Sequence, residues 1–466
     1  MVSSADEYEI TRTKHRGELA MALPDYENSL LMSLGCLTSE RTRLLRRLLH
    51  TASEHSPWHR KRLRGVNVNN FNEADLQSIP PMTKNDLMTH WNEIVTDNRL
   101  SLDLVNAHLS QLKTDRYLLD SFHAVASGGT SGQRGVFVYG WQEWIKLYCA
   151  MSRRTPRIHA TGIRQRESVE ADRTITRASI SAEKATHLSC AMSQTFSDPE
   201  NPTRRFPVTL PVEELVARLN SAQPWHLSGY PSMLYLLVHE ARNGKLSISP
   251  KTIRAYSEPL YPEIRVALEE TWGCDVTNLW GCSEGGIAKS CSFGHGMHIS
   301  DDLIIVEPVN SDGLPVPAGT PSAKIYLTNL YNETLPLIRY EIGDEITIID
   351  EPCKCGSVFT RIEDVQGRLD EVFVYESGQY IHPHVLRSIL GEYPGIIEYQ
   401  VSQTPRGVNI AVQTTALHFH QLQRAVTHVL HSLGIVRPEV SIIPVDRIPR
   451  LETGKLKRFV PLKKRE

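Results

Sequence analysis

Residues 126–140 read ASGGTSGQRGVFVYG, a run of small and hydroxyl residues that passes into an apolar, strand-like segment. Small residues let backbone amides approach phosphate oxygens closely, and the hydroxyls of Thr130 and Ser131 supply further hydrogen-bond donors. The run does not match the Walker pattern GxxxxGK[ST], because Gln133 and Arg134 stand where a lysine is wanted. By itself it is more typical of an ordinary loop than of a phosphate site, so its meaning depends on the rest of the chain.

Five further segments follow this run in a fixed order. They read YSEPL at 256–260, LWGCSEG at 279–285, RYEIGD at 339–344, GRLD at 367–370 and PRLETGK at 449–455. In this order and spacing, the chain resembles the adenylate-forming enzymes along nearly its whole length. PLIRY at 336–340 and a Cys-x-Cys-Gly at 353–356 are similar to the branch of phenylacetate-CoA ligase and its relatives.

The resemblance implies an α/β fold with a large multi-sheet N-terminal domain over 1–366 and a small α+β C-terminal lid domain over 367–466. At 466 residues the chain is too long for one ordinary core, so length alone predicts more than one domain. Between residues 122 and 365, strand-like runs alternate with helical patterns, which predicts α/β layers with ligands at strand ends. In the family the lid rotates about a hinge between two half-reactions, and Asp370 matches the hinge position.

Periodicity and punctuation predict particular elements. Residues 1–120 are expected to form a mostly helical scaffold, with one helix starting at Thr83. Pro262 should begin a helix that runs to Trp272. The remaining predictions are strands at 324–330 and 334–340, an exposed loop at 153–183, a strand at 371–375, a helix at 384–390, a hairpin of 398–402 with 408–414, a helix with Leu422, Val426, Val429 and Leu433 on one side, and a final strand at 439–445.

Three residues are expected to be catalytic. Activation of a carboxylate by ATP proceeds by in-line attack on the α-phosphorus, so it needs groups that neutralise charge and hold the phosphates. Lys455, which follows a glycine on a flexible tail, can bring a compact positive charge to the α-phosphate and the carboxylate. Glu284 suits Mg²⁺, and Ser283 is a hydroxyl donor to the α-phosphate. Without the resemblance, Lys455 would be a solvated charge in a basic tail and Glu284 a surface residue.

The resemblance also assigns the nucleotide site. Trp280 offers a face for adenine, Asp344 accepts hydrogen bonds from the ribose hydroxyls, and Arg368 is a further ribose or phosphate contact. Trp280 and Ser283 replace the family's usual tyrosine and threonine with the chemistry preserved. Alternatively, Arg339 and Asp344 could form a structural ion pair. The expected nucleotide-binding set is Ser127, Gly128, Gly129, Thr130, Ser131, Gly132, Ser257, Glu258, Pro259, Trp280, Gly281, Asp344 and Arg368.

Four of the cysteine and histidine residues have spacing that suits a metal. Cys353 and Cys355 form a tight pair before Gly356, and Cys291 precedes His298 by seven residues. Three thiolates and one imidazole suit a tetrahedral zinc, and some relatives in this branch carry such a structural zinc. His295 competes with His298 as the fourth ligand. Free thiols in loops are the alternative.

The acid and its acceptor are less defined. His187 is a candidate substrate-pocket residue, although a buried structural histidine is an equal alternative, and Tyr230 in a Tyr-Pro-Ser element is a candidate for the pocket wall. The branch suggests a small carboxylic acid such as an aromatic one. Most relatives pass the acyl group to coenzyme A. An amine, an alcohol or a carrier protein could also capture the adenylate, and other relatives activate a different oxyanion or stop after adenylylation.

Composition excludes some classes of partner. A net charge of −2 gives no reason to expect nucleic acid or an anionic membrane. The first residues lack the pattern of a signal peptide and no apolar run is long enough to cross a bilayer, so a cytoplasmic protein is expected, with a homodimer left open. The resulting hypothesis is an AMP-forming acid-thiol ligase that uses ATP, Mg²⁺ and coenzyme A. An inactive nucleotide-binding partner is disfavoured because Glu284, Asp344 and Lys455 are all present.

Overall fold

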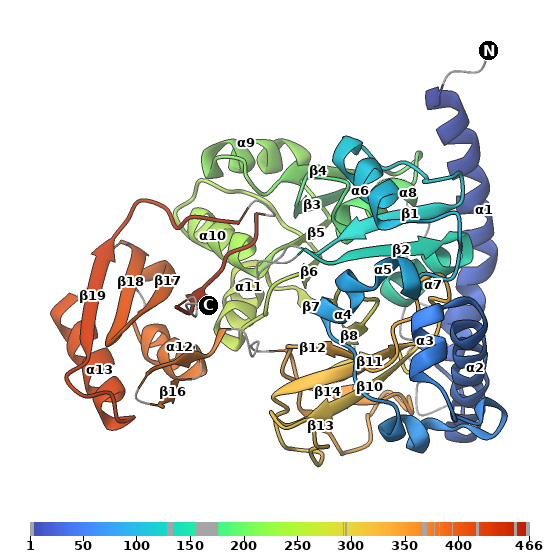
Figure 1. Ribbon diagram of the computed structural model, residues 1–466. Helices are drawn as coiled ribbons and strands as arrows, with labels where there is room; N and C mark the ends of the chain where they lie inside the picture. Colours follow the sequence, from blue (N-terminus) through green and yellow to red (C-terminus); the bar gives the residue numbers. More distant parts are fainter. Residues whose placement is uncertain are drawn as a thin grey trace.

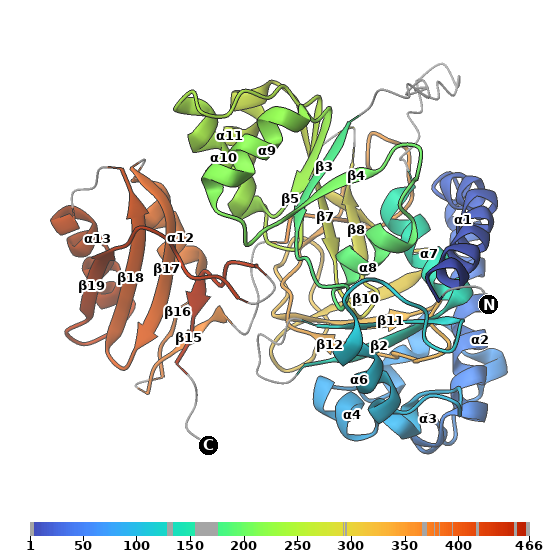
Figure 2. The same cartoon turned by 90° about the horizontal axis from the view of Figure 1, so that it is seen from above.

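The computed structural model describes residues 4–127, 134–153, 176–291, 293, 296–365, 371–376, 378–381, 383–393, 395–415, 419–451 and 454–462. The first two helices, α1 and α2 (Ser4–Ser29 and Leu34–His55), lie at one end of the molecule, the larger sheets lie in the middle, and the chain after residue 371 forms a separate C-terminal lobe at the other end (Figures 1 and 2). The predictions for Gly128, Gly129, Thr130, Ser131 and Gly132, and for Arg368 and Asp370, fall outside the described residues.

The helical scaffold expected at the N-terminus is confirmed. Its α-helices are α1 (Ser4–Ser29), α2 (Leu34–His55), α3 (Pro57–Arg62), α4 (Lys84–Thr89), α5 (Trp91–Ile94) and α6 (Leu102–Gln111). Helix α4 begins where predicted, because the Thr83 hydroxyl accepts a hydrogen bond from the Asp86 amide while the Asp86 carboxylate accepts one from the Thr83 amide. Helix α2 buries one leucine-rich stripe against the body.

A nine-stranded sheet crosses the centre, in the order β13-β14-β9-β8-β7-β6-β5-β3-β4. Its strands are β3 (Arg177–Ser181), β4 (Thr203–Pro207), β5 (His226–Gly229), β6 (Thr252–Tyr256), β7 (Asp275–Gly281), β8 (Ile287–Ser290), β9 (Met297–Ile299), β13 (Ile348–Ile349) and β14 (Arg361–Ile362). Pairing is parallel from β4 through β7 and antiparallel beyond β7. Helices α9 (Val212–Ala222), α10 (Pro231–Arg242) and α11 (Pro262–Trp272) share a core with its parallel half.

Two smaller sheets complete the body. One pairs β1 (Phe122–Ala126) with β2 (Val136–Gly140), and the other has the order β10 (Ile304–Val309), β11 (Lys324–Asn329), β12 (Tyr340–Ile342). Helices α7 (Trp141–Ser152) and α8 (Leu188–Thr195) follow β2 and β3 in the chain. The α/β class with several sheets is therefore confirmed, as are the predicted helix from Pro262 to Trp272 and the strand that starts at Lys324.

Two local predictions are wrong. Of the stretch predicted as an exposed loop, 153–183, residues 154–175 lie outside the described residues, and the part after them contains β3, a buried strand inside the parallel half of the sheet. In β3, Ser179 and Ser181 alternate with Ala178 and Ile180, so the sequence lacks the apolar run that is typical of a buried strand. Residues 334–339 are not a strand, because Pro336 interrupts the backbone and Arg339 has a positive φ of 51°. The segment instead wraps over the scaffold, where the Met82 amide donates to the Arg339 carbonyl.

The C-terminal lobe has its own core. Its elements are β15 (Phe373–Val374), β16 (Tyr380–Ile381), α12 (Pro383–Gly391), β17 (Ile396–Thr404), β18 (Gly407–Thr414), α13 (Phe419–Ser432), β19 (Glu439–Pro444) and β20 (Phe459–Val460). The predicted hairpin is confirmed as β17 and β18. Helix α13 buries Leu430 in place of the predicted Leu433, which is 40% exposed. The domain division at residue 366 stays a prediction, since 366–370 are not described.

None of the described helices is both long and apolar enough to cross a membrane.

Candidate active site

The turn between β7 and β8 carries Ser283 and Glu284, and three buried side chains fix its backbone. The Tyr139 hydroxyl donates to the Ser283 carbonyl at 2.6 Å, the Asn329 amide donates to the Glu284 carbonyl at 3.0 Å, and the Tyr331 hydroxyl donates to the Gly285 carbonyl at 3.1 Å. Gly285 has a φ of +94°, and a Cβ there would collide with Asn329 and Tyr331. Three side-chain hydrogen bonds therefore hold the backbone of the turn in place.

Trp280 and Asp344 are joined directly. The indole Nε1 donates a hydrogen bond of 2.8 Å to Oδ2 of Asp344, which follows β12. Arg339, considered from the sequence as a partner of Asp344, forms its ion pair with Glu307 instead, at 3.0 Å. The structure thus places the predicted adenine face beside the predicted ribose acceptor.

Glu284 and Asp344 bring two carboxylates close to Cys282 of this turn. Glu284 is buried, and its charge, after burial itself, raises the pKa of Tyr340 above its usual range. Burial first, then the charges of Glu284 and Asp344, raise the pKa of the Cys282 thiol. Both carboxylates therefore lie near the half-buried Cys282 thiol. Glu284 is the predicted Mg²⁺ ligand, and Mg²⁺ binds carboxylate oxygens.

The phosphate-loop candidate leaves β1 and enters β2, and both of its ends are fixed. The Ser127 hydroxyl accepts a hydrogen bond of 2.9 Å from the Gly135 amide, and the Ser127 amide donates to the Gly135 carbonyl at 2.9 Å. The Ala126 amide donates to the carbonyl of Thr186, next to His187. Half-buried His187 thus lies beside the start of this loop, at the N-terminus of α8.

Tyr230 lies under the segment 256–260. Only 1% of its surface is exposed, and its hydroxyl accepts a hydrogen bond of 3.2 Å from the Ala182 amide. Its ring meets that of Tyr256 edge to face, at 5.8 Å between centroids. The Tyr256 hydroxyl in turn lies 2.8 Å from the Ser179 hydroxyl. Tyr230 therefore packs in the core against Tyr256, and its place in the pocket wall stays a prediction.

Glu258 has a contact that its position in the motif did not predict. Its Oε2 accepts a hydrogen bond of 3.1 Å from the Ser232 amide, and its Oε1 accepts one of 2.7 Å from the Leu456 amide. Leu456 adjoins Lys455, so the predicted nucleotide segment and the predicted catalytic tail are in contact. Ser257 and Pro259 follow the end of β6, and Gly281 is the last residue of β7.

Lys455 lies on a tight turn of the tail. The Gly454 amide donates to the Leu451 carbonyl at 2.8 Å, and the Leu451 amide donates to the Lys455 carbonyl at 3.0 Å. Gly454 has a φ of +75°, and a Cβ there would collide with Val208 of the body. Figure 2 shows the tail reaching from the C-terminal lobe toward the body. Residue 454 must therefore be glycine for two reasons: its backbone has a positive φ, and a side chain would collide with Val208.

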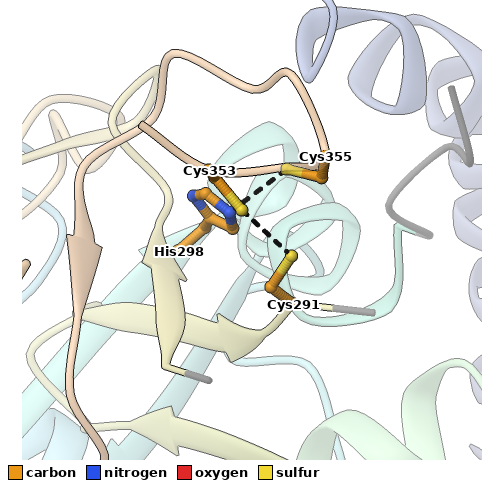
Figure 3. A group of neighbouring side chains, drawn as sticks. All are labelled: Cys291, His298, Cys353 and Cys355. Atoms are coloured by element: carbon orange, nitrogen blue, oxygen red, sulfur yellow. Dashed lines mark hydrogen bonds between the residues drawn. The ribbon is translucent and has the colours of Figure 1, made fainter. Parts of the chain in front are cut away.

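Cys291, His298, Cys353 and Cys355 converge, with ligand atoms all within 4.8 Å of one another (Figure 3). The Cys291 and Cys353 sulfurs are 3.4 Å apart, as are the Cys355 sulfur and Nε2 of His298. Nδ1 of His298 lies 3.0 Å from the Phe359 carbonyl, so Nδ1 carries the proton. Nε2 is then unprotonated and can bind a metal. Three thiolates and one oriented imidazole fit a tetrahedral zinc. His295 lies outside the described residues.

Sequence reasoning missed the residues that hold the site from behind. Tyr139, Asn329 and Tyr331 clamp the β7–β8 turn, and Arg450 of the tail contacts α10. The clamp residues are ordinary apolar or polar positions of strands and loops with no local pattern. Arg450 lies inside PRLETGK, but the motif gave no reason to expect a role for this position.

Comparison with known proteins agrees with the motif order. No family model matches the chain. Phenylacetate-coenzyme A ligase of Thermus thermophilus is 28% identical over 286 residues, which are 54% of this chain and 63% of that enzyme. Protein CapK of Staphylococcus aureus is 24% identical over 158 residues, a third of each chain (33% and 33%). The chain therefore spans less than two thirds of the curated relatives that it matches.

Solved structures agree on the fold. 2-Hydroxyisobutyryl-CoA ligase in the postadenylation state with 2-HIB-AMP superposes with a TM-score of 0.69 at 19% identity, over 93% of this chain and 91% of that one. The same ligase in the thioesterification state with 2-HIB-AMP and CoA gives 0.57 at 19% identity, over 92% and 91%. The resemblance to adenylate-forming ligases and to their phenylacetate-CoA ligase branch is confirmed, and the chain has the fold of these ligases.

Proposed function

We propose that this protein, which has the fold of the adenylate-forming ligases, is an ATP-dependent, AMP-forming acid-thiol ligase. It activates a small carboxylic acid as an acyl-adenylate with release of pyrophosphate, and then transfers the acyl group to a thiol, for which coenzyme A is the first choice. The sequence relative is a ligase of phenylacetate, and the structural neighbour was solved with an acyl-adenylate and with CoA. Both support this reaction class for the present chain.

One contact carries the proposal. The Leu456 amide donates to Glu258 at 2.7 Å, so the turn that holds Lys455 lies on the segment 256–260 at the end of β6. A lysine in the C-terminal tail can take part in catalysis only if the tail reaches the nucleotide site. Here the tail reaches a segment that the motif order assigns to adenine, in the same sheet edge as Trp280 and the β7–β8 turn.

The chemistry follows from these groups. A carboxylate oxygen of the acid attacks the α-phosphorus in line, the bond from that phosphorus to the bridging oxygen breaks, and pyrophosphate leaves. Lys455 neutralises charge that develops on the α-phosphate, and the Ser283 hydroxyl donates to it. A Mg²⁺ bound at Glu284 would supply further charge neutralisation on the phosphates. In the second step the thiolate attacks the acyl carbon and AMP leaves.

The test is pyrophosphate release from ATP and Mg²⁺ across a panel of aromatic and short aliphatic acids, each with and without coenzyme A. We expect release that depends on one class of acid and falls by roughly 100-fold or more in Lys455→Ala, because a charge aimed at the transition state contributes several kcal/mol. Lys457→Ala removes the same charge two residues further along the tail and serves as the matched control.

The acceptor is decided by the same assay. Turnover that rises with coenzyme A, with the thioester as product, supports the proposal. Turnover that instead requires an amine, an alcohol or a carrier protein would assign an amide or ester ligase or a carrier-protein loader. Absence of acid-dependent release in a preparation that still binds ATP contradicts carboxylate activation and favours another oxyanion.

A further inference from the structure

Glu258 holds together two segments that are far apart in the chain. Its two carboxylate oxygens accept from the backbone amides of Ser232 and Leu456, at 3.1 and 2.7 Å. The Ser232 amide belongs to the first turn of α10, where backbone amides have no partner within the helix. The helix dipole also favours a carboxylate at that end. Glu258 thus caps α10 with one oxygen and fixes the tail with the other.

Arg450 of the same tail makes a second connection. Its Nη1 donates to the Ser232 hydroxyl at 2.8 Å, and its Nη2 donates to Oε1 of Glu398 in β17 at 2.6 Å. The side chains of Arg450 and Glu398 are 6% and 2% exposed. A buried ion pair costs much desolvation, and breaking it leaves an uncompensated buried charge. Arg450 therefore connects β17 of the C-terminal lobe with Ser232 at the start of α10.

Tyr261 at the start of α11 adds an aromatic contact between the same two parts. The guanidinium groups of Arg387 and Arg458, both from the C-terminal lobe, lie 4.3 and 5.4 Å from its ring centre. Tyr261 follows the segment 256–260 directly. Contacts from three places in the lobe and tail thus converge on the N-termini of α10 and α11.

We propose that Glu258 and Arg450, with Ser232 and Glu398 as their partners, are positioning residues that dock the turn carrying Lys455 for the adenylation step. This docking cluster consists of Ser232, Glu258, Glu398, Arg450 and Leu456. The inference rests on the proposed function and deepens it. It gives the Glu258 side chain a role different from the nucleotide contact that its motif position suggested, because both of its oxygens already accept amide hydrogens.

The two roles for Glu258 predict different kinetics. A nucleotide contact, when lost, raises KM for ATP. A residue that only places Lys455 lowers kcat of adenylation with KM for ATP nearly unchanged, since binding and chemistry are then separated. Transfer of the acyl group from preformed adenylate does not use Lys455 in the proposed mechanism, so it should be spared.

The experiment compares Glu258→Gln, Glu258→Ala and Arg450→Met with the wild type. Glu270→Gln, on the exposed end of α11, and Arg447→Met, an exposed arginine in the same tail, are matched controls. For the Glu258 and Arg450 variants, we expect acid-dependent exchange of pyrophosphate into ATP to fall roughly 10- to 100-fold in kcat, as for loss of hydrogen bonds to a charged group. KM for ATP and thioester formation from preformed adenylate should stay within about twofold, since neither uses the docked lysine. Glu258→Gln, which keeps one acceptor oxygen, should lie between the wild type and Glu258→Ala.

A second readout does not need activity. Amide hydrogen exchange is followed at Leu456 and Ser232 in each full-length variant. Exchange at both amides should speed up at least roughly tenfold in Glu258→Ala and stay at the wild-type rate in Glu270→Gln, because only the first removes their acceptor. Unchanged exchange at Leu456 in Glu258→Ala would overturn the inference.

The kinetic outcomes separate the inference from the proposed function. A rise in KM for ATP with kcat unchanged would overturn the positioning role in favour of a nucleotide contact. An equal fall in both half-reactions would overturn it in favour of a general structural role. A wild type without acid-dependent exchange contradicts the proposed function, and in that event amide exchange alone decides whether the docking cluster holds the tail.

Discussion

Nε1 of Trp280, in the nine-stranded sheet, donates a hydrogen bond of 2.8 Å to Oδ2 of Asp344. Trp280 lies in the penultimate position of β7, and Asp344 comes just after β12. The bond fixes the rotation of the indole ring and engages one oxygen of the carboxylate. In the proposed nucleotide site, a ring held in this way would give adenine a preorganised face, and the carboxylate would accept hydrogen bonds from the ribose hydroxyls.

Substitutions at this pair should weaken ATP binding. We expect Asp344→Ala to raise KM for ATP roughly 10- to 100-fold, because it removes hydrogen bonds made by a charged acceptor. Trp280→Phe keeps an aromatic face but removes the donor, so its effect should be smaller, about two- to tenfold. Steady-state kinetics with varied ATP measure both.

The double variant provides a further check of the same pair. Its effect on KM should be smaller than the product of the two single effects, since the residues share one hydrogen bond. Asp350→Ala, an exposed aspartate after β13, is the control and should leave KM unchanged. An unchanged KM for ATP in Asp344→Ala would refute the assignment of this carboxylate to the nucleotide.

Gly454→Ala should disable adenylation while the protein stays folded. The added Cβ meets Val208 on a backbone with φ of +75°, so the turn that carries Lys455 cannot dock in the same place. Displacing a catalytic group by about 1 Å can cost about 100-fold in rate. Acid-dependent exchange of pyrophosphate into ATP measures the effect, and thermal unfolding confirms that the fold is kept.

Gly378→Ala is the matched control for that variant. Gly378 lies in the same C-terminal lobe and has a φ of +88°, but a Cβ there meets no atom within 4 Å. Both variants therefore place alanine on a backbone with positive φ, which is unfavourable in each case. Only Gly454→Ala also brings a Cβ against Val208 of the body. Equal loss of adenylation in the two would mean that strain in the glycine backbone, and not docking against Val208, limits the reaction.

Removal of zinc should destabilise the β8–β9 hairpin and the loop at 353–360. We expect roughly one zinc per chain in purified protein, measured by elemental analysis, and its loss in Cys353→Ser and Cys355→Ser. Because a structural metal contributes directly to folding, both variants and the chelated wild type should unfold at a lower temperature. Cys36→Ser, an exposed cysteine in α2, should keep the metal. Wild-type protein free of zinc after growth in zinc would show that Cys291, Cys353 and Cys355 are free thiols and that His298 binds no metal.

Much of this architecture could be predicted because its signals are local. The α4 capping box and the Pro262 helix start were predictable from a few adjacent residues, and both are confirmed. Cys291, His298, Cys353 and Cys355 were grouped by spacing and converge as expected. Strand β3 was missed because two of its four buried positions are serines, and the hydroxyl of one of them, Ser179, bonds to Tyr256 of β6. A periodicity argument counts such positions as polar.

The contacts of Glu258 could not be predicted for a different reason. Its motif indicates which ligand lies near the segment, but its partner Leu456 lies 198 residues away in the chain. Such a pair depends on how two folded parts meet, and no local pattern carries that information. The same holds for the clamp of Tyr139, Asn329 and Tyr331 under the β7–β8 turn.

His15 provides a test of stability against pH. Its ring lies on α1 with no exposed surface, stacked on Trp141 at 3.8 Å between centroids. Nε2 donates to the Trp141 carbonyl and Nδ1 accepts from the Tyr117 hydroxyl, each at 3.0 Å. Burial, and secondly the nearby His123, lower the pKa of His15 from 6.5 to about 3. The folded protein thus keeps this imidazole neutral.

Acid should therefore destabilise the wild type more than His15→Phe, which keeps an aromatic ring at this place. Below pH 6.5 the unfolded chain takes up a proton at His15 that the folded protein does not accept until about pH 3. This part of the stability is complete above pH 6.5 and is lost as the pH falls. Between pH 6 and pH 4 the free energy of unfolding should fall more steeply in the wild type, by up to about 1.4 kcal/mol per pH unit. Denaturant titrations at several pH values measure both slopes. His50→Gln, at an exposed position in α2, should keep the wild-type slope, and identical slopes for the wild type and His15→Phe would show that His15 is not held neutral.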